Sequence, residues 1–437
     1  MPAIVVRNGE LLDPGENISG LGHIVAKDGH ITYVGPDLAQ ARMVAGPDAM
    51  DFDAEGLMVV PGLIDMHVHF REPGNEAEET VASGSLAAVA GGFTSVVCMA
   101  NTDPVVDTEA DIISARQKSE LVGLANIFPV GAVTAGRRGE ELAEMAQMAR
   151  GGAVAFSDDG TAVPTAGLLR RALSYAKMLG RPILEHCEDR SLIGEGVMNE
   201  DFVSTTLGLN GIPDEAEDII VARDVALARL TGGHIHIQHV STANAVAIIR
   251  SAKETGVRVT AEVTPHHLTL NSDCLKTYDP VFRVSPPLRT QTDVLACRQG
   301  LKDGVIDAIA SDHAPHLEEE KELEFAFSPP GMIGLESTLA ILSTELVEPG
   351  FFTWSEILPA LTAHPSDILN LGRGRLRLGL PADITLIDTK MRWQIDKHRF
   401  HSRSRNCPFD RREVVGRVVA TMVGGKVKFS LSNPTVS

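Results

Sequence analysis

The sequence predicts an α/β protein: a (β/α)8 TIM barrel with a small composite β-sandwich domain formed by both termini. Through the middle of the chain, eight short apolar segments alternate with amphipathic helical segments, and strand-like segments with glycine turns occupy both ends. The length of 437 residues suits one barrel of roughly 250 residues plus a smaller unit. A doubly wound parallel sheet is the alternative arrangement for the same alternation.

Both ends of the chain carry short strands. Apolar alternation predicts strands over residues 3–13, 23–35 and 56–62, with Gly9, Gly29 and Gly35 at hairpin turns. Near the other end it predicts strands over 382–388 and 417–429, the second interrupted by a two-residue turn at Gly424 and Gly425. We therefore expect residues 1–60 and 362–437 to build one β domain beside a barrel of residues 61–361.

The barrel segment contains eight strand candidates. They span residues 63–69, 94–100, 126–132, 153–158, 182–187, 236–241, 257–264 and 306–312. Stretches rich in Ala, Leu and Glu predict helices between several of them, over residues 140–150, 167–180, 218–230 and 243–256. Eight strands alternating with helices favour a closed barrel.

Composition excludes several classes of function. The formal net charge of −19 argues against a surface for phosphate backbones, and no stretch approaches the ~18–20 apolar residues that span a bilayer. The five cysteines are an odd number without a C-x-x-C pair, which indicates neither a disulfide framework nor a cysteine zinc site. The N-terminus lacks the pattern of a signal peptide. These features predict a cytoplasmic protein that binds neither nucleic acid nor membrane.

Histidines and aspartates gather at the expected tips of the barrel strands, which form the active face of such a fold. His67 and His69 lie two apart, so the strand period directs both into the mouth. Four further candidates end other strands: Asp159, His186, His239 and Asp312. Four imidazoles and two carboxylates exceed the needs of one tetrahedral zinc, which indicates two metals, or one metal plus a base.

Some positions remain open at this level. Asp158 and Asp159 both follow strand four, and either carboxylate is able to bridge two ions. His234 and His236 have the opposite parity to His239 and are expected to face the helices. Arg71 is suited to grip a substrate carboxylate through paired hydrogen bonds, although a lone arginine more often makes a salt bridge.

Motifs along nearly the whole chain resemble those of the amidohydrolase superfamily and, within it, the long bacterial dihydroorotases. The motifs are VVPGLIDMHVHFREPG, GGFTSVVCMANTDPV, FSDDG, HCED, HVSTANAV, EVTPHHL, SPPLR, SDHAPH, PGMIGLE and GLPADITLID. Many hydantoinase-like relatives bridge their metals with a carboxylated lysine, but this chain has no lysine between Lys118 and Lys177. The resemblance therefore implies an aspartate as the bridge between two zinc ions, and the family's spacing to the histidine of HCED favours Asp159 over Asp158.

The same resemblance implies the metal ligands and the reaction. The ligands would be His67, His69, Asp159, His186, His239 and Asp312. Asp312 would also be the catalytic acid and base. The implied reaction is the reversible cyclisation of N-carbamoyl-L-aspartate to dihydroorotate, with release of water, in pyrimidine biosynthesis.

For the substrate, the resemblance implies contacts from Arg71, Asn101, His316 and the metal ligand His69. Two positions depart from the family pattern. Ser285 stands where asparagine is usual, as in many hydantoinases and allantoinases, and Pro330 stands where phenylalanine is common. Proline has no N–H to offer a ligand, so Gly331 is the better candidate for a backbone contact.

Two rival functions remain. Another cyclic amidase, a hydantoinase or an allantoinase, would share the metal site but acts on neutral rings, for which the motif arginine has no use. A non-catalytic dihydroorotase-like scaffold for aspartate carbamoyltransferase would be expected to have lost ligands, which this chain retains. Among possible partners, the resemblance implies a homodimer and, for some members, association with that carbamoyltransferase.

Overall fold

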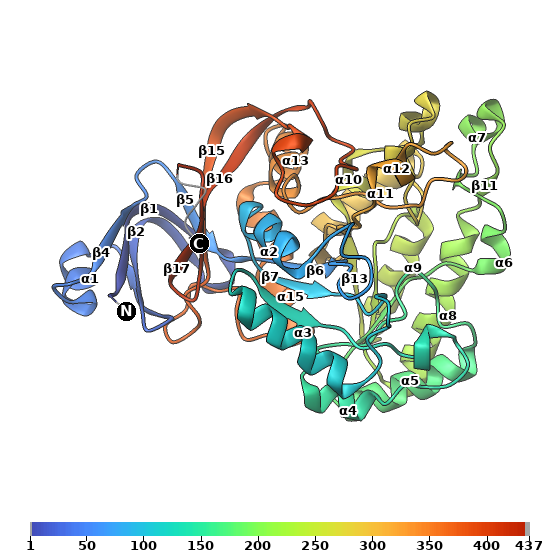
Figure 1. Cartoon of the computed structure of the whole chain (residues 1–437), viewed down its shortest axis with the longest axis horizontal. Helices are drawn as coiled ribbons and strands as arrows, with labels where there is room; N and C mark the ends of the chain where they lie inside the picture. The colour runs from blue at the N-terminus through green and yellow to red at the C-terminus, as the bar shows by residue number, and fades with distance from the viewer. Residues whose placement is uncertain (1, 433–437) are drawn as a thin grey trace.

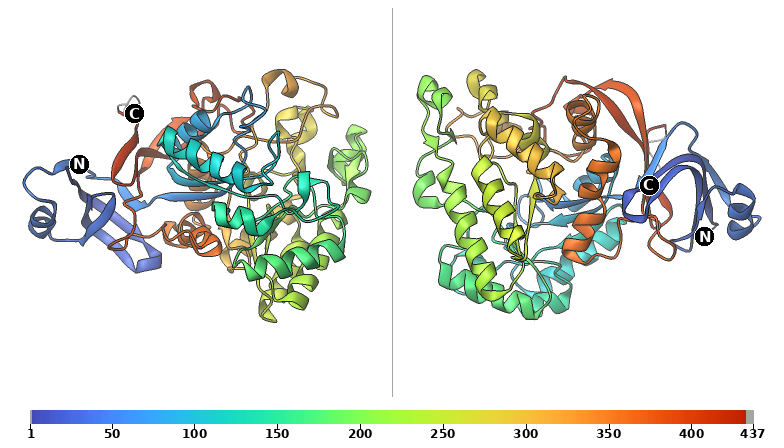
Figure 2. Two further views of the ribbon diagram at one scale, coloured as in Figure 1. Left: turned by 60° about the horizontal axis from the view of Figure 1, so that its bottom comes forward. Right: turned by 180° about the vertical axis from the view of Figure 1, so that it is seen from behind.

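The computed structural model describes residues 2–432, and its two ends form one β domain at one side of the barrel (Figures 1 and 2). Its eight-stranded sheet has the path β17-β16-β15-β5-β1-β2-β3, with β4 paired to β1. The central antiparallel pair β5 and β15 joins the two ends of the chain. The strands are β1 (Ile4–Asp13), β2 (Ile18–Lys27), β3 (His30–Gly35), β4 (Met50–Asp53), β5 (Met58–Pro61), β15 (Ile384–Gln394), β16 (Glu413–Val423) and β17 (Lys426–Ser430).

The expected glycine turns are correct at two places and wrong at two, Gly9 and Gly35. Gly35 ends β3, and the chain continues into helix α1 (Leu38–Ala45) rather than into a hairpin. Gly29 has a φ of 82° in the turn between β2 and β3, and Gly424 and Gly425 have φ values of 55° and 70° between β16 and β17. Gly9 instead lies within β1 at a register shift, where a Cβ atom would stand 2.4 Å from Val59. Gly9 therefore permits close packing of β1 rather than a chain reversal.

The barrel is a closed ring of parallel segments. Strands β6 (Leu63–Val68), β7 (Phe93–Cys98) and β8 (Asn126–Pro129) form one arc, and β9 (Ile183–Glu185), β12 (Ile235–Ile237), β13 (Val259–Val263) and β14 (Ala308–Ile309) form the other. Parallel bridges from Gly131 to Phe156 and from Phe156 to Ile183 close one gap, and a bridge from Val68 to His313 closes the other. The fourth strand is thus a single bridging position at Phe156.

Helices cover the outside of this ring (Figure 1). The helices around the barrel that have at least seven residues are α2 (Val81–Ala90), α3 (Glu109–Val122), α4 (Met145–Gly151), α5 (Ala166–Met178), α8 (Glu215–Thr231), α9 (Ala243–Glu254), α11 (Gln291–Lys302) and α15 (Ala363–Leu369). The shorter ones are α6 (Arg190–Ile193), α7 (Phe202–Leu207), α10 (Pro265–Thr269), α12 (Glu318–Lys321), α13 (Thr338–Leu342) and α14 (Trp354–Ile357). Strands β10 (Met198–Asn199) and β11 (Gly211–Ile212) pair in a loop, and α1 (Leu38–Ala45) packs on the β domain.

The helix expected over residues 140–150 begins later than the composition suggested. It starts at Met145, because Leu142 makes an antiparallel bridge with Thr134 and the carbonyl of Glu141 accepts the N–H of Ala135. The expected helices in α5, α8 and α9 lie within three residues of their observed ends. Local pairing, which a helical composition does not reveal, removes the first turn of α4.

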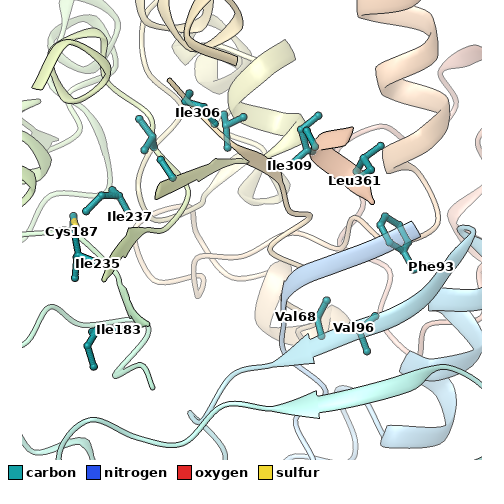
Figure 3. Packing of buried hydrophobic residues seen from close by; sticks show 14 of the residues in the cluster. Val68, Phe93, Val96, Ile183, Cys187, Ile235, Ile237, Ile306, Ile309 and Leu361 are labelled. Atoms are coloured by element: carbon teal, nitrogen blue, oxygen red, sulfur yellow. The ribbon is translucent and has the colours of Figure 1, made fainter. Parts of the chain in front are cut away.

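The main hydrophobic core lies between the ring and its helices (Figure 3). It includes side chains from opposite sides of the ring, among them Val68, Val96, Ile183, Ile235 and Ile309. Because side chains alternate along a strand, the residues next to these point into the barrel. None of the helices described in residues 2–432 combines the length and apolar character needed to cross a membrane.

A buried carboxyl group beside the β domain gives the stability a predicted pH dependence. Burial raises the pKa of Glu336 to about 8, although its carboxylate accepts the N–H groups of His401 and Ser402. The folded state therefore binds this proton more tightly than the unfolded state, and the contribution of Glu336 to stability falls as pH rises from the ordinary carboxyl pKa towards 8.

Glu336→Gln should remove this loss, because a glutamine oxygen accepts the same N–H groups without a charge. The free energy of unfolding of the variant should increase relative to that of the unchanged protein as pH rises from 5 to 9, as measured by urea titrations at a series of pH values. Parallel stability profiles for the two proteins would contradict the assignment.

Candidate metal centre and active site

The end of β6 carries two imidazoles into the barrel mouth. His67 and His69 flank Val68, whose side chain packs under the helices, so strand alternation directs both rings to the opposite side. The ring centroids lie 5.2 Å apart, and both side chains are buried. The expected orientation of this pair agrees with the structure.

The expectation for His236 is wrong. Ile235 and Ile237 pack towards the helices, whereas His236 points into the barrel and lies 3.2 Å from the carboxylate of Glu262. His239 still reaches the mouth, because its φ of 32° breaks the strand alternation after β12. Strand alternation predicts the wrong side for His236 because the extended conformation does not continue from β12 through His239.

Asp159 lies at the centre of the cluster. Its Oδ1 lies 3.2 Å from Nε2 of His67 and its Oδ2 lies 3.5 Å from Nε2 of His69. The Oδ1 atom is also 3.8 Å from Nδ1 of His186 and 3.8 Å from Nε2 of His239. One carboxylate thus faces four imidazole nitrogens with both of its oxygens, which is the arrangement that a bridge between two cations requires.

Asp312 completes the cluster from the other side. Its Oδ1 lies 3.1 Å from Nε2 of His69 and 3.5 Å from Nε2 of His67. Two sets of three ligand atoms, each set within 4.8 Å, result from these positions: His67 with Asp159 and His239, and His67 with His69 and Asp312. The two sets share His67, so the cluster offers ligands for a metal ion at the barrel mouth.

The donor set fits a divalent metal. Among residues 2–432, the buried Oδ1 of Asp159 has no hydrogen-bond partner, although imidazole nitrogens surround it. An unpartnered buried carboxylate oxygen is costly unless a cation compensates it. Imidazole nitrogen and carboxylate oxygen are the ligands that zinc accepts in proteins.

The electrostatics of the cluster also favour a cation. Burial opposes charge on His67, but the carboxylates of Asp159 and Asp312 raise the pKa of that imidazole well above its ordinary value. Burial would raise the pKa of Asp159, but the facing imidazoles lower it well below its ordinary value. The two carboxylates therefore hold positive charge in this place, and metal binding would displace protons from the imidazoles.

Outer carboxylates that the sequence interpretation missed hold the imidazoles in place. Glu262 Oε1 lies 2.7 Å from Nδ1 of His67, and Glu188 Oε2 lies 2.7 Å from Nε2 of His186. Such partners fix the tautomer and orientation of a ligating histidine. Glu188 lies two residues after His186 in HCED, and Glu262 has the inward parity of β13, so both signals were present in the sequence.

Asp158, the competitor of Asp159, has a separate role. Its Oδ1 accepts the N–H groups of Val133 and Thr134, and its Oδ2 accepts the hydroxyl of Thr134 at 2.5 Å. These bonds tie the fourth barrel segment to the loop after β8. They occupy the carboxylate away from the imidazole cluster.

A cavity of about 220 Å³ opens above the cluster. Among the residues expected at the site, only the fully buried His67 is absent from its lining. The lining contains His69, Arg71, Asn101, Asp159, His186, His239, Ser285, Asp312, His316, Pro330 and Gly331, together with Gly160, Val284 and Ala314. Segments separated by more than 200 residues thus converge on one small polar chamber.

Arg71 is held by its Nε atom. This atom donates to the carbonyl of Pro315 at 3.1 Å and lies 2.9 Å from the carboxylate of Glu78. Within residues 2–432, the terminal nitrogens of this guanidinium donate no hydrogen bond, and the residue lines the cavity. The anchored Nε leaves the two terminal nitrogens for a ligand.

Asn101 and Ser285 contact the metal-site residues as well as the cavity. The side chain of Asn101 lies 2.9 Å from Nδ1 of His69 and donates to Asp159 at 3.2 Å. The hydroxyl of Ser285 donates to Glu188 through a short hydrogen bond. Ser285 is therefore linked to His186 through one carboxylate.

The loop containing Pro330 and Gly331 is closely packed against His316. Nε2 of His316 lies 2.9 Å from the carbonyl of Pro330, and a Cβ on Gly331, whose φ is 147°, would stand 2.7 Å from that nitrogen. The N–H of Gly331 donates to the carbonyl of Arg283 at 2.9 Å. The loop therefore uses the N–H of Gly331 internally, and the expected contact of Gly331 with a ligand stays a prediction.

A closed parallel barrel with this histidine and aspartate cluster at its mouth defines a metal-dependent amidohydrolase. The dihydro-orotase-like family model matches residues 56–245. Two similar proteins are the dihydroorotases of Pelotomaculum thermopropionicum, 50% identical over 97% of this chain and 98% of its own, and of Pelobacter propionicus, 49% identical over 98% and 99%. The chain belongs to the dihydroorotase family.

Solved structures show the same fold at lower sequence identity. The L-hydantoinase (dihydropyrimidinase) of Arthrobacter aurescens has a TM-score of 0.86 and 24% identity, covering 98% of this chain and 96% of its own. The dihydropyrimidinase of Brevibacillus agri has a TM-score of 0.83 and 23% identity, covering 97% and 94%. These neighbours confirm the predicted barrel with a β-sandwich domain.

Proposed function

We propose that this chain is a dihydroorotase that holds two zinc ions bridged by Asp159 and interconverts N-carbamoyl-L-aspartate and dihydroorotate in pyrimidine biosynthesis. The single observation that carries the metal assignment is the position of Asp159 between four imidazoles with an unpartnered buried oxygen. The ligands would be His67, His69, Asp159, His186, His239 and Asp312. The family membership supports the reaction.

The bound ions would lower the pKa of a water molecule and polarise the amide carbonyl of the ring. The chain's own residues then position the substrate and move a proton. In the proposal, Asp312 accepts the proton of the attacking water and delivers it to the departing ring nitrogen. Since Asp312 Oδ1 lies 3.1 Å from Nε2 of His69, the base is held beside the ligands.

The substrate carboxylate would lie against Arg71. Its guanidinium is anchored at Nε, which leaves the terminal nitrogens to form two parallel hydrogen bonds with a carboxylate. Asn101, His316, Ser285, Pro330 and Gly331 would complete the pocket around the ring, with Gly331 contributing close approach rather than its N–H. Neutral hydantoin and allantoin rings have no carboxylate for this arginine.

A substrate panel tests the reaction. Zinc-loaded protein should hydrolyse dihydroorotate and form it from N-carbamoyl-L-aspartate, with little turnover of hydantoin or allantoin. If the protein turned over hydantoin but not dihydroorotate, the assignment would be refuted. That result would favour the rival function of a hydantoinase or allantoinase, in which serine is common at the position of Ser285. Absence of all turnover with full zinc content would favour the non-catalytic scaffold.

Arg71→Met should raise the KM for dihydroorotate and lower kcat/KM by about 100-fold, because a charge-assisted pair of hydrogen bonds is lost. Steady-state kinetics and zinc content are the measurements. Arg138→Met is the matched control, since that side chain is 61% exposed and lies 3.9 Å from Glu140. An unchanged KM in Arg71→Met would show that the carboxylate binds elsewhere.

Four further features remain proposals. The chain is proposed to divide into a β domain of residues 1–60 and 362–437 and a barrel of residues 61–361. It is proposed to act in the cytoplasm as a homodimer, with association to aspartate carbamoyltransferase as a possible further assembly. Light scattering of the protein alone and with the carbamoyltransferase measures both associations.

A further inference from the structure

One segment of the chain has a charge opposite to that of the whole. Between Arg392 and Arg417 there are eight lysines and arginines but three aspartates and glutamates, in a protein of net charge −19. Nothing in the proposed reaction uses these cations. Clustered positive charge on an acidic protein attracts anions locally.

This segment borders a cavity well away from the metal centre. The cavity has a volume of about 490 Å³ and lies where β15 and β16 arch over α13, at the junction of the barrel and the β domain (Figure 1). Its walls come from the end of α2, from α13, from β15 to β17 and from the loop 396–401. It shares no lining residue with the active-site cavity.

Two guanidinium groups face this cavity. Arg417 stacks on the ring of Trp393, with 4.5 Å between the guanidinium carbon and the ring centroid, and Arg399 follows from the adjoining loop. Across the described part of the chain, neither side chain has an ion pair or a hydrogen bond to another residue. Burial lowers the pKa of Arg417, and Arg399 lowers it further, so the pair is held without a compensating anion.

The two acidic groups in the wall are occupied by the chain. Asp396 accepts the N–H of His398 at 3.0 Å, and Glu336 accepts the N–H groups of His401 and Ser402. Because the pKa of Glu336 is about 8, its carboxyl is mainly protonated at neutral pH. Within the described residues, neither group forms an ion pair with Arg399 or Arg417.

Apolar and aromatic side chains form part of the remaining lining, beside the polar Gln394 and His401. Trp393, Phe400, Phe429 and Leu339 contribute to this apolar part, beside the cationic side. Cavities of roughly 300–1,000 Å³ with apolar walls and few charged groups are typical of small-molecule sites. A flat ring against the aromatic side chains and a phosphate between the guanidiniums match this division of the walls.

We propose that the cavity between β15, β16 and α13 is a second ligand site, which binds a nucleoside monophosphate through Arg399 and Arg417. The phosphate pairs with the two guanidiniums, and the base lies against the aromatic wall. The site is separate from the metal centre and does not depend on the assigned reaction.

Calorimetric titration of the zinc-loaded protein with adenosine and uridine 5′-monophosphates tests this proposal. We expect saturable binding of one nucleotide per chain. Arg399→Gln and Arg417→Gln should each weaken it by about tenfold, as expected when a charge-assisted contact is lost. Arg411→Gln is the matched control, because Arg411 belongs to the same segment, is 88% exposed and does not line the cavity.

Binding measurements on the unchanged protein test the proposal independently of whether the variants fold. Saturating dihydroorotate should leave nucleotide affinity within twofold, and inorganic phosphate alone should bind at least tenfold more weakly. Absence of saturable binding would overturn the proposal. So would displacement by dihydroorotate, equal binding of inorganic phosphate, or an equal loss of affinity in Arg411→Gln.

Discussion

Asp312→Asn should retain its zinc and lose about 10³-fold in kcat, the range in which removal of a general acid or base falls. The facing imidazoles lower the pKa of Asp312 although burial opposes this, so the carboxylate is ionised. Asparagine keeps one oxygen at the same position but has no basic oxygen to take a proton. Elemental analysis and steady-state kinetics on the same preparation measure the two effects.

The prediction separates a base from a mere ligand. If Asp312 acted only through metal binding, activity in the variant would fall in proportion to zinc content and would recover when zinc is added in excess. A variant with full zinc and near-normal turnover would refute the proton-transfer role. The loss should appear in kcat rather than in KM, because Asp312 is not proposed to hold the substrate carboxylate.

Asp159→Ala should abolish stable metal binding and with it the activity. Partners that only orient a ligand contribute 10–100-fold to metal affinity, and removal of the shared carboxylate should exceed that range. The four imidazoles would then face one another around Asp312 alone, which leaves too little negative charge for two cations. Competition with a chelator measures the affinity, and thermal unfolding reports whether the variant folds.

Asp158→Asn is the matched control for this variant. The two aspartates are neighbours and both are buried, but Asp158 binds the N–H groups of Val133 and Thr134. The control should lose some stability and keep its zinc. Loss of metal in Asp158→Asn, with retention in Asp159→Ala, would reverse the assignment of the bridge.

Much of the fold was predictable because its signals are local. Alternating apolar residues gave the strands of both ends, and the order of strands and helices gave the barrel. The fourth barrel segment contributes its bridges through Phe156 alone, yet its position between Gly131 and Ile183 was already implied by the alternation. The unpredicted details, the bulge at Gly9 and the late start of α4, come from contacts with other segments.

The sequence by itself determined the class of site, because it placed histidines and aspartates at the tips of five predicted strands. Only the tertiary structure decided which nitrogen faces which oxygen, that His236 points inwards, and that Arg283 occupies the N–H of Gly331. Residue identity is a property of the chain. The direction in which a side chain points depends on backbone angles such as the φ of 32° at His239. The use of a backbone N–H depends on partners distant in the sequence, such as Arg283 for Gly331. Neighbouring residues in the sequence do not reveal either.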